Sequence, residues 1–184
     1  MRRKTAKELL AESFRQLAEK KSIDRITIRE IAENSGYSQA TFYRQFHDKY
    51  DLIAWDYTRR LEEIMSQITG DAYSWQKALH DAAEYFHAQK KYLANLFLHT
   101  SGLDSFISYM REINFRTLKQ TVLRITGSEE TDEQITMYIR IYVLGTVQLT
   151  CEWILGQYHV SPEQLAEIYD RALPEPIAPY LRRV

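Results

Sequence analysis

Residues 27–52 constrain the fold more than any other part of the chain, because they carry the signals of two short helices joined by a tight turn. Thr27 and Glu30 have the spacing of a capping box, which begins a helix. Gly36 stands where a left-handed residue ends that helix, and Ser38 is placed to cap the next one. The segment therefore predicts a helix-turn-helix, followed closely by a third helix.

The second of these helices is expected to present polar groups outward. Phe42 and Phe46 lie four residues apart, so they share one face and hold the helix against a core. The other side chains are small, amide, phenol and guanidinium groups, which suit the DNA major groove. A third helix begins at Lys49, and a cation beside a helix N-terminus favours a phosphate contact. We therefore predict a DNA-binding surface that includes Gln39, Ala40, Thr41, Tyr43, Arg44 and Lys49, with Ser38 and His47 beside the two ends of the second helix.

Ten positions of this segment share the spacing of a known signature: Thr27, Ile31, Ala32, Gly36, Ser38, Thr41, Tyr43, Phe46, Lys49 and Leu52. In them the chain resembles the helix-turn-helix of TetR-type transcriptional regulators. The resemblance implies that bases and flanking backbone are contacted by Gln39, Ala40, Thr41, Tyr43 and Arg44. It also implies that Thr27 and Lys49 hold phosphates. The operator sequence does not follow, because Ala40 replaces a frequent glycine and the position of Arg44 varies within the family.

The distribution of charge agrees with a protein that binds DNA through one end. Residues 1–60 carry 13 Lys and Arg against 9 Asp and Glu, whereas residues 61–184 carry 11 against 16. A basic first part on an acidic remainder is typical of such a protein. An excess of this size also arises by chance, so it supports the motif without replacing it. Arg2, Arg3 and Lys4 are either an arm for the minor groove or, as we favour, a frayed terminus.

The remainder of the chain also favours helices, since all four prolines lie at or after Pro162. Apolar periodicity and capping signals predict helices over residues 5–20, 49–68, 75–87, 92–98, 103–125, 134–158 and 161–173. We therefore expect an all-α fold in two domains. Residues 1–50 would form a three-helix DNA-binding domain, helix 49–68 would connect it onward, and residues 71–180 would form a helical bundle for effector binding and dimerisation.

Residues 134–158 are apolar on almost every side of the predicted helix, which indicates burial on more than one face. In a chain of this size, one face would meet its own core and another would meet a second subunit. We predict a homodimer whose interface includes Gly145, Leu149, Trp153, Leu165, Ile168 and Tyr169. A homodimer would place two reading helices one DNA turn apart, about 34–36 Å, on a palindromic operator.

Aromatic residues are frequent after residue 84, and some of them would line an effector pocket. The alternative, that they are core, is equally open. The candidates for the pocket are Tyr85, Phe86, Phe106, Tyr109, Tyr138, Arg140 and Tyr142. Arg140 lies in an apolar helix and needs an anionic partner, for which an internal carboxylate is favoured over a ligand.

Together these features predict a repressor that an unidentified small-molecule effector releases from its operator. The alternative is a TetR-type activator controlled by a partner protein. The chain length, the helix beginning at Trp75 and the sequence of the last two long helices resemble regulators of dihydroxyacetone kinase operons, which favours that alternative.

A helical metal-dependent enzyme is a more remote reading. His80, Glu84 and His87 share one helical face and would need a fourth metal ligand from elsewhere. The dense cysteine and histidine spacing of a dedicated site is absent, so we interpret them as solvated polar residues. No phosphate loop or nucleophile motif occurs. We therefore expect no catalytic residue, no metal and no cofactor.

The sequence also bears on the compartment. The first residues lack the apolar run of a signal peptide. The longest uncharged stretch near the C-terminus, 141–151, has 11 residues, whereas a membrane span needs about 18–20. Cys151 is the only cysteine and has apolar neighbours, so no intrachain disulfide is expected and the thiol should be buried. These features predict a cytoplasmic protein without a membrane partner.

Overall fold

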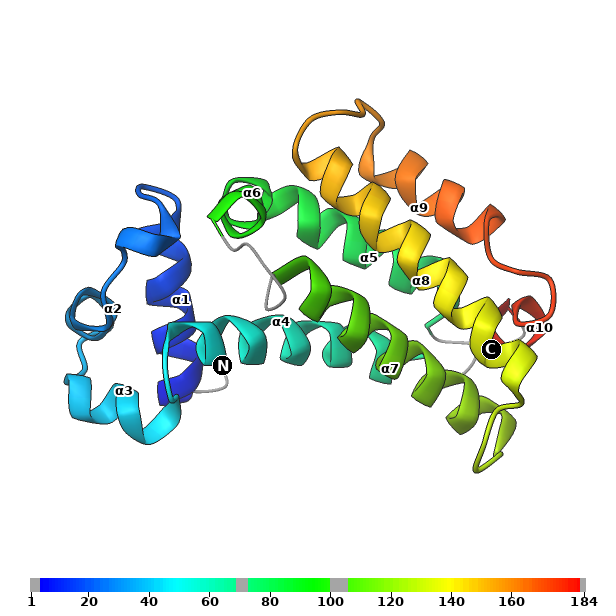
Figure 1. Ribbon diagram of the computed structural model, residues 1–184, viewed down its shortest axis with the longest axis horizontal. Helices are drawn as coiled ribbons and strands as arrows, with labels where there is room; N and C mark the ends of the chain where they lie inside the picture. Colours follow the sequence, from blue (N-terminus) through cyan, green and yellow to red (C-terminus); the bar gives the residue numbers. More distant parts are fainter. Residues whose placement is uncertain (1–3, 69–72, 100–105, 183–184) are drawn as a thin grey trace. The chain divides into compact units, whose positions relative to one another are not determined.

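The computed structural model describes residues 4–68, 73–99 and 106–182, and the regular elements within these ranges are helices (Figure 1). The all-α prediction is therefore confirmed. Arg2, Arg3 and the predicted start of a helix at residue 103 lie outside the described residues. In chain order the helices are α1 (Ala6–Ala18), the 3-10 helix η1 (Ile23–Arg25), α2 (Ile28–Ser35), α3 (Gln39–Gln45), α4 (Lys49–Ser66), α5 (Trp75–Ala88), α6 (Lys90–His99), α7 (Phe106–Thr126), α8 (Glu133–Ile154), α9 (Pro162–Arg171) and α10 (Ala178–Arg182).

The chain divides into two compact units. Unit 1 comprises Met1–Arg59 and Lys91–Phe106, and unit 2 comprises Arg60–Lys90 and Ile107–Val184. Nearly all of α6 thus groups with the N-terminal helices, although it is separated from them in sequence. The predicted division at residues 50 and 71 did not anticipate this grouping, because periodicity marks a helix without identifying its partner.

The helix-turn-helix forms within unit 1 from the predicted signals. The Thr27 hydroxyl accepts the Glu30 backbone N–H at 3.3 Å, and the Glu30 carboxylate accepts the Thr27 N–H at 2.9 Å. Gly36 ends α2 with φ of +76°, a left-handed conformation that only glycine adopts readily. The Ser38 hydroxyl then caps α3 by accepting the Thr41 N–H at 3.2 Å.

The core of unit 1 contains apolar side chains from all of its helices. The fully buried members include Leu10, Phe14, Ile23, Ile26, Ile31, Phe42, Leu52, Leu93 and Leu96. Two polar interactions add to this core. Arg15 of α1 forms an ion pair with the buried Asp56 of α4. Asn95 of α6 donates to the carbonyls of Ala18 and Lys21 at 2.7 and 2.8 Å and accepts the Ile23 N–H at 3.1 Å.

In unit 2, α8 buries one side and leaves the other exposed. The Tyr142 hydroxyl donates to the Tyr169 carbonyl at 2.9 Å, and the Tyr169 hydroxyl donates to the Thr146 carbonyl at 3.0 Å, so α8 and α9 are joined by hydrogen bonds. Helix α5 also packs along α9. Burial raises the pKa of Cys151 to about 11, as expected for a structural thiol.

Candidate nucleic-acid interface

Helix α3 is held by two buried phenylalanines. Phe42 is inaccessible to solvent and Phe46 nearly so, and their ring centroids lie 5.7 Å apart. Phe46 also meets Trp55 of α4 edge-on, with centroids 5.6 Å apart. The two aromatic anchors fix the rotation of this short helix about its axis. Its opposite face is open, with exposed side chains at Gln39, Ala40, Tyr43 and Arg44.

The structure brings three of the predicted residues together on this face. Arg44 Nη2 donates to Thr41 Oγ1 at 2.9 Å, and the hydroxyls of Ser38 and Thr41 share a hydrogen bond of 3.1 Å. The Arg44 guanidinium has five N–H donors, so most of them stay available for a base or phosphate. The arrangement presents a pre-positioned guanidinium, which suits bidentate recognition of guanine.

Lys49 does not have the free ammonium group that the phosphate prediction requires. Its Nζ donates to the carbonyls of Ile23, Ile26 and Asp24 at 2.8, 3.0 and 3.1 Å. Burial lowers the pKa of Lys49 below its usual value. All three donors of the ammonium are used to hold the η1 connection, so a structural role becomes the alternative to the phosphate contact of Lys49, which stays a prediction.

The N-terminus of α4 is also occupied. Asp48 Oδ1 accepts the backbone N–H groups of Tyr50 and Asp51 at 2.8 and 2.9 Å, which are the groups that would otherwise bind an anion.

His47 and Thr27, which are also predicted to contact DNA, differ in exposure and bonding. The His47 side chain is 93% exposed and lies 3.9 Å from a carboxylate oxygen of Asp48, whereas the Thr27 hydroxyl is engaged in its capping box. Contacts of both with DNA stay predictions.

The seven residues predicted for an effector pocket are divided between the two units. Phe106 belongs to unit 1, where it packs on Tyr57 and Phe97. Tyr142 is buried and hydrogen-bonded within unit 2. Arg140 forms the favoured salt bridge, with Glu112 at 3.0 Å, and its guanidinium carbon lies 3.4 Å from the centroid of the Phe115 ring. Periodicity could not separate core aromatics from lining ones, and the effector pocket stays a prediction.

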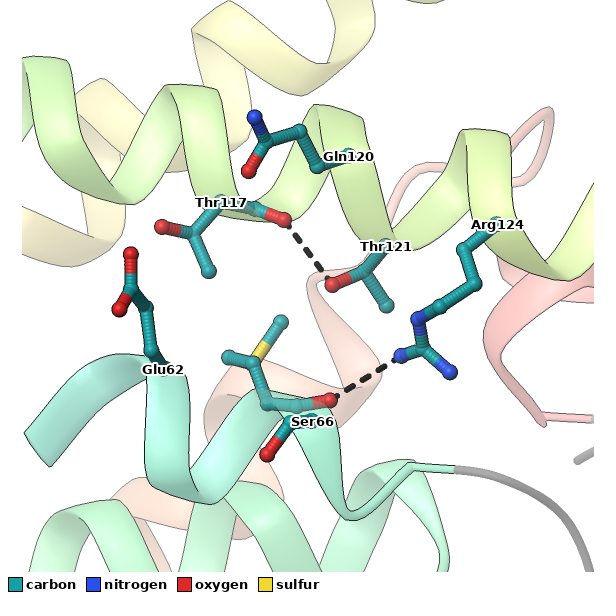
Figure 2. A pocket seen from close by; sticks show the side chains of 7 residues that line it. Glu62, Ser66, Thr117, Gln120, Thr121 and Arg124 are labelled. Carbon is teal, nitrogen blue, oxygen red and sulfur yellow. Dashed lines mark hydrogen bonds between the residues drawn. The ribbon is translucent and has the colours of Figure 1, made fainter. Parts of the chain in front are cut away.

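A hollow of about 260 Å³ lies instead between α4 and α7 within unit 2. Figure 2 shows mainly polar side chains around it, and the lining residues are Glu62, Met65, Ser66, Thr117, Gln120, Thr121 and Arg124. Arg124 donates to the carbonyls of Ile68 and Met65 at 2.7 and 3.1 Å, so it ties α7 to the end of α4. This hollow was not predicted, because its lining is mainly polar whereas the predicted pocket was mainly aromatic.

The predicted dimer residues divide into two groups. Leu149 and Ile168 are exposed to 36% and 46%, and Gly145 is also exposed. Trp153, Leu165 and Tyr169 are buried within the chain, and their part in an interface stays a prediction. Trp153 Nε1, for example, donates to the Val160 carbonyl at 2.9 Å.

Three exposed apolar residues of α8 were not predicted: Met137, Ile141 and Leu144. They continue a stripe through Gly145 and Leu149 along the exposed side of the helix. A Cβ added to Gly145 would meet nothing within 4 Å in the chain itself, so internal packing does not require a glycine there. The spacing of these residues makes them a continuous exposed apolar stripe along one side of α8.

The three residues of α5 that were weighed as metal ligands do not stay together. His80 and Glu84 of α5 lie close to Glu163 of α9, with one ligand atom of each within 4.8 Å of the others. His87 instead packs on Trp153, with ring centroids 5.8 Å apart. Glu163 is the third member of the cluster, and spacing along one helix could not identify it because it lies on another helix.

The anchored reading helix and the separate helical unit define a helix-turn-helix DNA-binding protein with a second, all-helical unit. Residues 5–54 match the model of the tetR family of bacterial regulatory proteins, and residues 73–174 match a transcriptional regulator C-terminal region. The chain belongs to the tetR family and is a DNA-binding transcriptional regulator. None of the helices in the described ranges combines the length and hydrophobicity needed to span a membrane.

Individual relatives are similar to this chain at low identity. The dhaKLM operon transcriptional activator DhaS of Lactococcus lactis is 20% identical over 99 residues, which span 54% of this chain and 52% of that protein. A solved structure of DhaS has a TM-score of 0.69 at 18% identity, covering 91% of this chain and 93% of the other. A TetR regulator from Rhodococcus sp. RHA1 gives 0.64 at 18% identity, covering 91% and 94%. These structural likenesses concern the fold.

Proposed function

We propose that the protein acts as a homodimer that reads a palindromic operator through α3. The observation that carries this proposal is the guanidinium of Arg44, held by Thr41 on the exposed face of a helix whose other face is anchored. Arg44, Gln39 and Tyr43 would contact bases or flanking backbone, and His47 would contact the backbone. DNA as the ligand also fits the expected cytoplasmic location.

A selection of bound fragments from the native genome tests the DNA-binding proposal. The wild-type protein is expected to enrich a near-palindrome, and Arg44→Ala is expected to lose this enrichment. Arg116→Ala, which removes an exposed arginine from α7 of unit 2, is the matched control and should retain it. Enrichment by Arg44→Ala equal to that of the wild type would refute the role of α3.

The homodimer is supported by the exposed stripe of α8. Ile141 is 62% exposed, and one interface across the stripe would bury Met137, Ile141 and Leu144 together. Ile141→Glu is expected to give monomers in sedimentation and to weaken operator binding. Leu98→Glu, at a residue of α6 that is 65% exposed, is the control and should leave the dimer intact. A dimer that survives Ile141→Glu would place the interface elsewhere.

Release from the operator would follow ligand binding in the hollow between α4 and α7. A ligand that accepts hydrogen bonds from Arg124 would compete with the carbonyls of Met65 and Ile68, and so loosen the end of the helix that begins next to α3. A coupling of about 1–3 kcal/mol changes DNA affinity about 5- to 150-fold. Arg124→Met should lower operator affinity without ligand, whereas Gln120→Ala should not.

A second candidate is an activator that responds to a partner protein. The observation in its favour is the likeness to DhaS, which is named as an activator of its operon. Transcription from a reporter carrying the selected operator separates the two candidates. A repressor lowers transcription until a small molecule is added, whereas an activator raises transcription, and a partner-controlled one does so only when the second protein is present.

A further inference from the structure

We propose that His80, Glu84 and Glu163 form a binding site for a divalent transition-metal ion such as Zn²⁺, which would join α5 to α9. The site lies wholly within unit 2, and the proposed DNA-binding function does not depend on it. One imidazole and two carboxylates are ligands that Zn²⁺ accepts, with water completing the coordination.

The three ligands come from two packed helices. His80 and Glu84 are one helical turn apart on α5, so their side chains project from the same face. Glu163 is the second residue of α9, which packs along α5. Zn–N and Zn–O bonds of about 2.0–2.2 Å put neighbouring donors about 3.5 Å apart in a tetrahedral site. The three donor atoms already lie within 4.8 Å, so small rotations of exposed glutamates would complete the geometry.

The orientation of His80 is the strongest argument. Its Nε2 is 3.9 Å from Glu163 Oε1 and faces the cluster, while its Nδ1 is 3.6 Å from Asp81 Oδ1. Metal-bound histidines commonly direct the second ring nitrogen to a carboxylate, which fixes the ring and increases the basicity of the first. Asp81 is itself held, because the Tyr73 hydroxyl donates to its Oδ2 at 2.7 Å.

The charges around the cluster also favour a cation. Lys77 pairs with Asp81 at 3.5 Å. Within residues 4–68, 73–99 and 106–182, Glu84 has no Lys or Arg partner. Two carboxylates brought this close repel each other unless a positive charge lies between them. A divalent ion would supply that charge and link the two helices.

The test titrates tag-free, metal-stripped full-length protein with zinc sulfate in a calorimeter. One ion per chain is expected to bind, and Zn²⁺ should raise the unfolding temperature. His80→Ala and Glu163→Gln should each weaken Zn²⁺ binding at least about tenfold. Mutation of a residue that only hydrogen-bonds a metal ligand already lowers metal affinity by about that factor, and these two residues are ligands themselves. His159→Ala, an exposed histidine, and Glu167→Gln, one turn further along α9, are the matched controls and should bind as the wild type does.

A cobalt spectrum identifies the ligands independently. Co²⁺ bound at this site should show nitrogen and oxygen coordination without a thiolate charge-transfer band, because Cys151 is buried elsewhere. Absence of Zn²⁺ binding to the wild type, or equal binding by His80→Ala and Glu163→Gln, would overturn the proposal. A thiolate band would do so as well.

Discussion

Lys49 Nζ donates a hydrogen bond of 2.8 Å to the carbonyl of Ile23, a residue 26 positions earlier in the chain. Two further carbonyls of the same connection accept from this ammonium. The family resemblance predicts that Lys49 contacts a DNA phosphate. In this structure its ammonium instead holds the η1 connection, which comes just before the helix-turn-helix. Its contribution to binding would be indirect, through the stability and alignment of unit 1.

Lys49→Met should destabilise the protein by at least about 1.5 kcal/mol, because it removes hydrogen bonds from a charged donor and leaves three carbonyls without it. Chemical denaturation measures this change, and Lys20→Met, at an exposed lysine of the same unit, should change stability little. The salt dependence of operator binding is the sharper readout. A direct phosphate contact would reduce the log–log slope by about 0.9 in the variant, whereas a structural role leaves the slope unchanged.

The contact between Thr41 and Arg44 predicts a specific pattern of operator discrimination. If Arg44 pairs with a guanine, Arg44→Ala should cost about 1–3 kcal/mol of binding and relax preference at a single base pair. Thr41→Val keeps the shape but removes the acceptor for Arg44, and should cost about 0.5–1.5 kcal/mol. Anisotropy titrations against operators changed one pair at a time measure both.

In a double-mutant cycle, the effect of Thr41→Val should largely vanish when Arg44 is already alanine. Equal losses across all operator variants would show that Arg44 contacts the DNA backbone and does not read a base.

Asn95 should matter for stability, although it lies far in sequence from the helices it holds. Asn95→Ala removes two donated hydrogen bonds and one accepted, and we expect a loss of about 1–3 kcal/mol. Hydrogen exchange should also speed up at the Ile23 amide. Lys91→Ala, on the exposed side of the same helix, is the control, and an equal loss in that variant would argue against a specific role for the amide.

The stability of unit 1 should fall in acid through Glu30. Hydrogen bonds from Lys21 and Thr27 lower the pKa of Glu30 from 4.5 to about 2. Since the folded-state pKa is depressed, the stabilisation is fully present above pH 4.5 and is lost as pH falls through about 2. Unfolding measured across this range should show a smaller decline for Glu30→Gln. Glu33→Gln, on the same helix, should keep the decline of the wild type.

Local signals in the sequence predicted the helix-turn-helix well. The capping box at Thr27, the left-handed Gly36 and the cap at Ser38 act within a few residues, so their spacing in the sequence is enough to place them. The same holds for the two anchoring phenylalanines of α3. The face of α3 that remains exposed follows directly from the face that these two residues bury.

Interactions between distant residues could not be predicted in this way. The packing of the helices decides these contacts. Examples are the carbonyls that accept from Lys49, the connection that Asn95 holds and the partner of His80 on α9. Apolar periodicity predicts that α8 is buried on more than one face, but it does not show that Trp153 turns inward while Ile141 turns outward. A hollow lined by threonines and an arginine has no characteristic sequence pattern, so it could not be predicted from the sequence.

The most direct test of the account is the number of chains on a selected operator, measured together with a footprint of the bound DNA. We predict two chains per operator, protecting two major-groove segments about 34–36 Å apart on one side of the duplex. One chain per site, or equal affinity for unrelated duplexes at the same salt concentration, would contradict it.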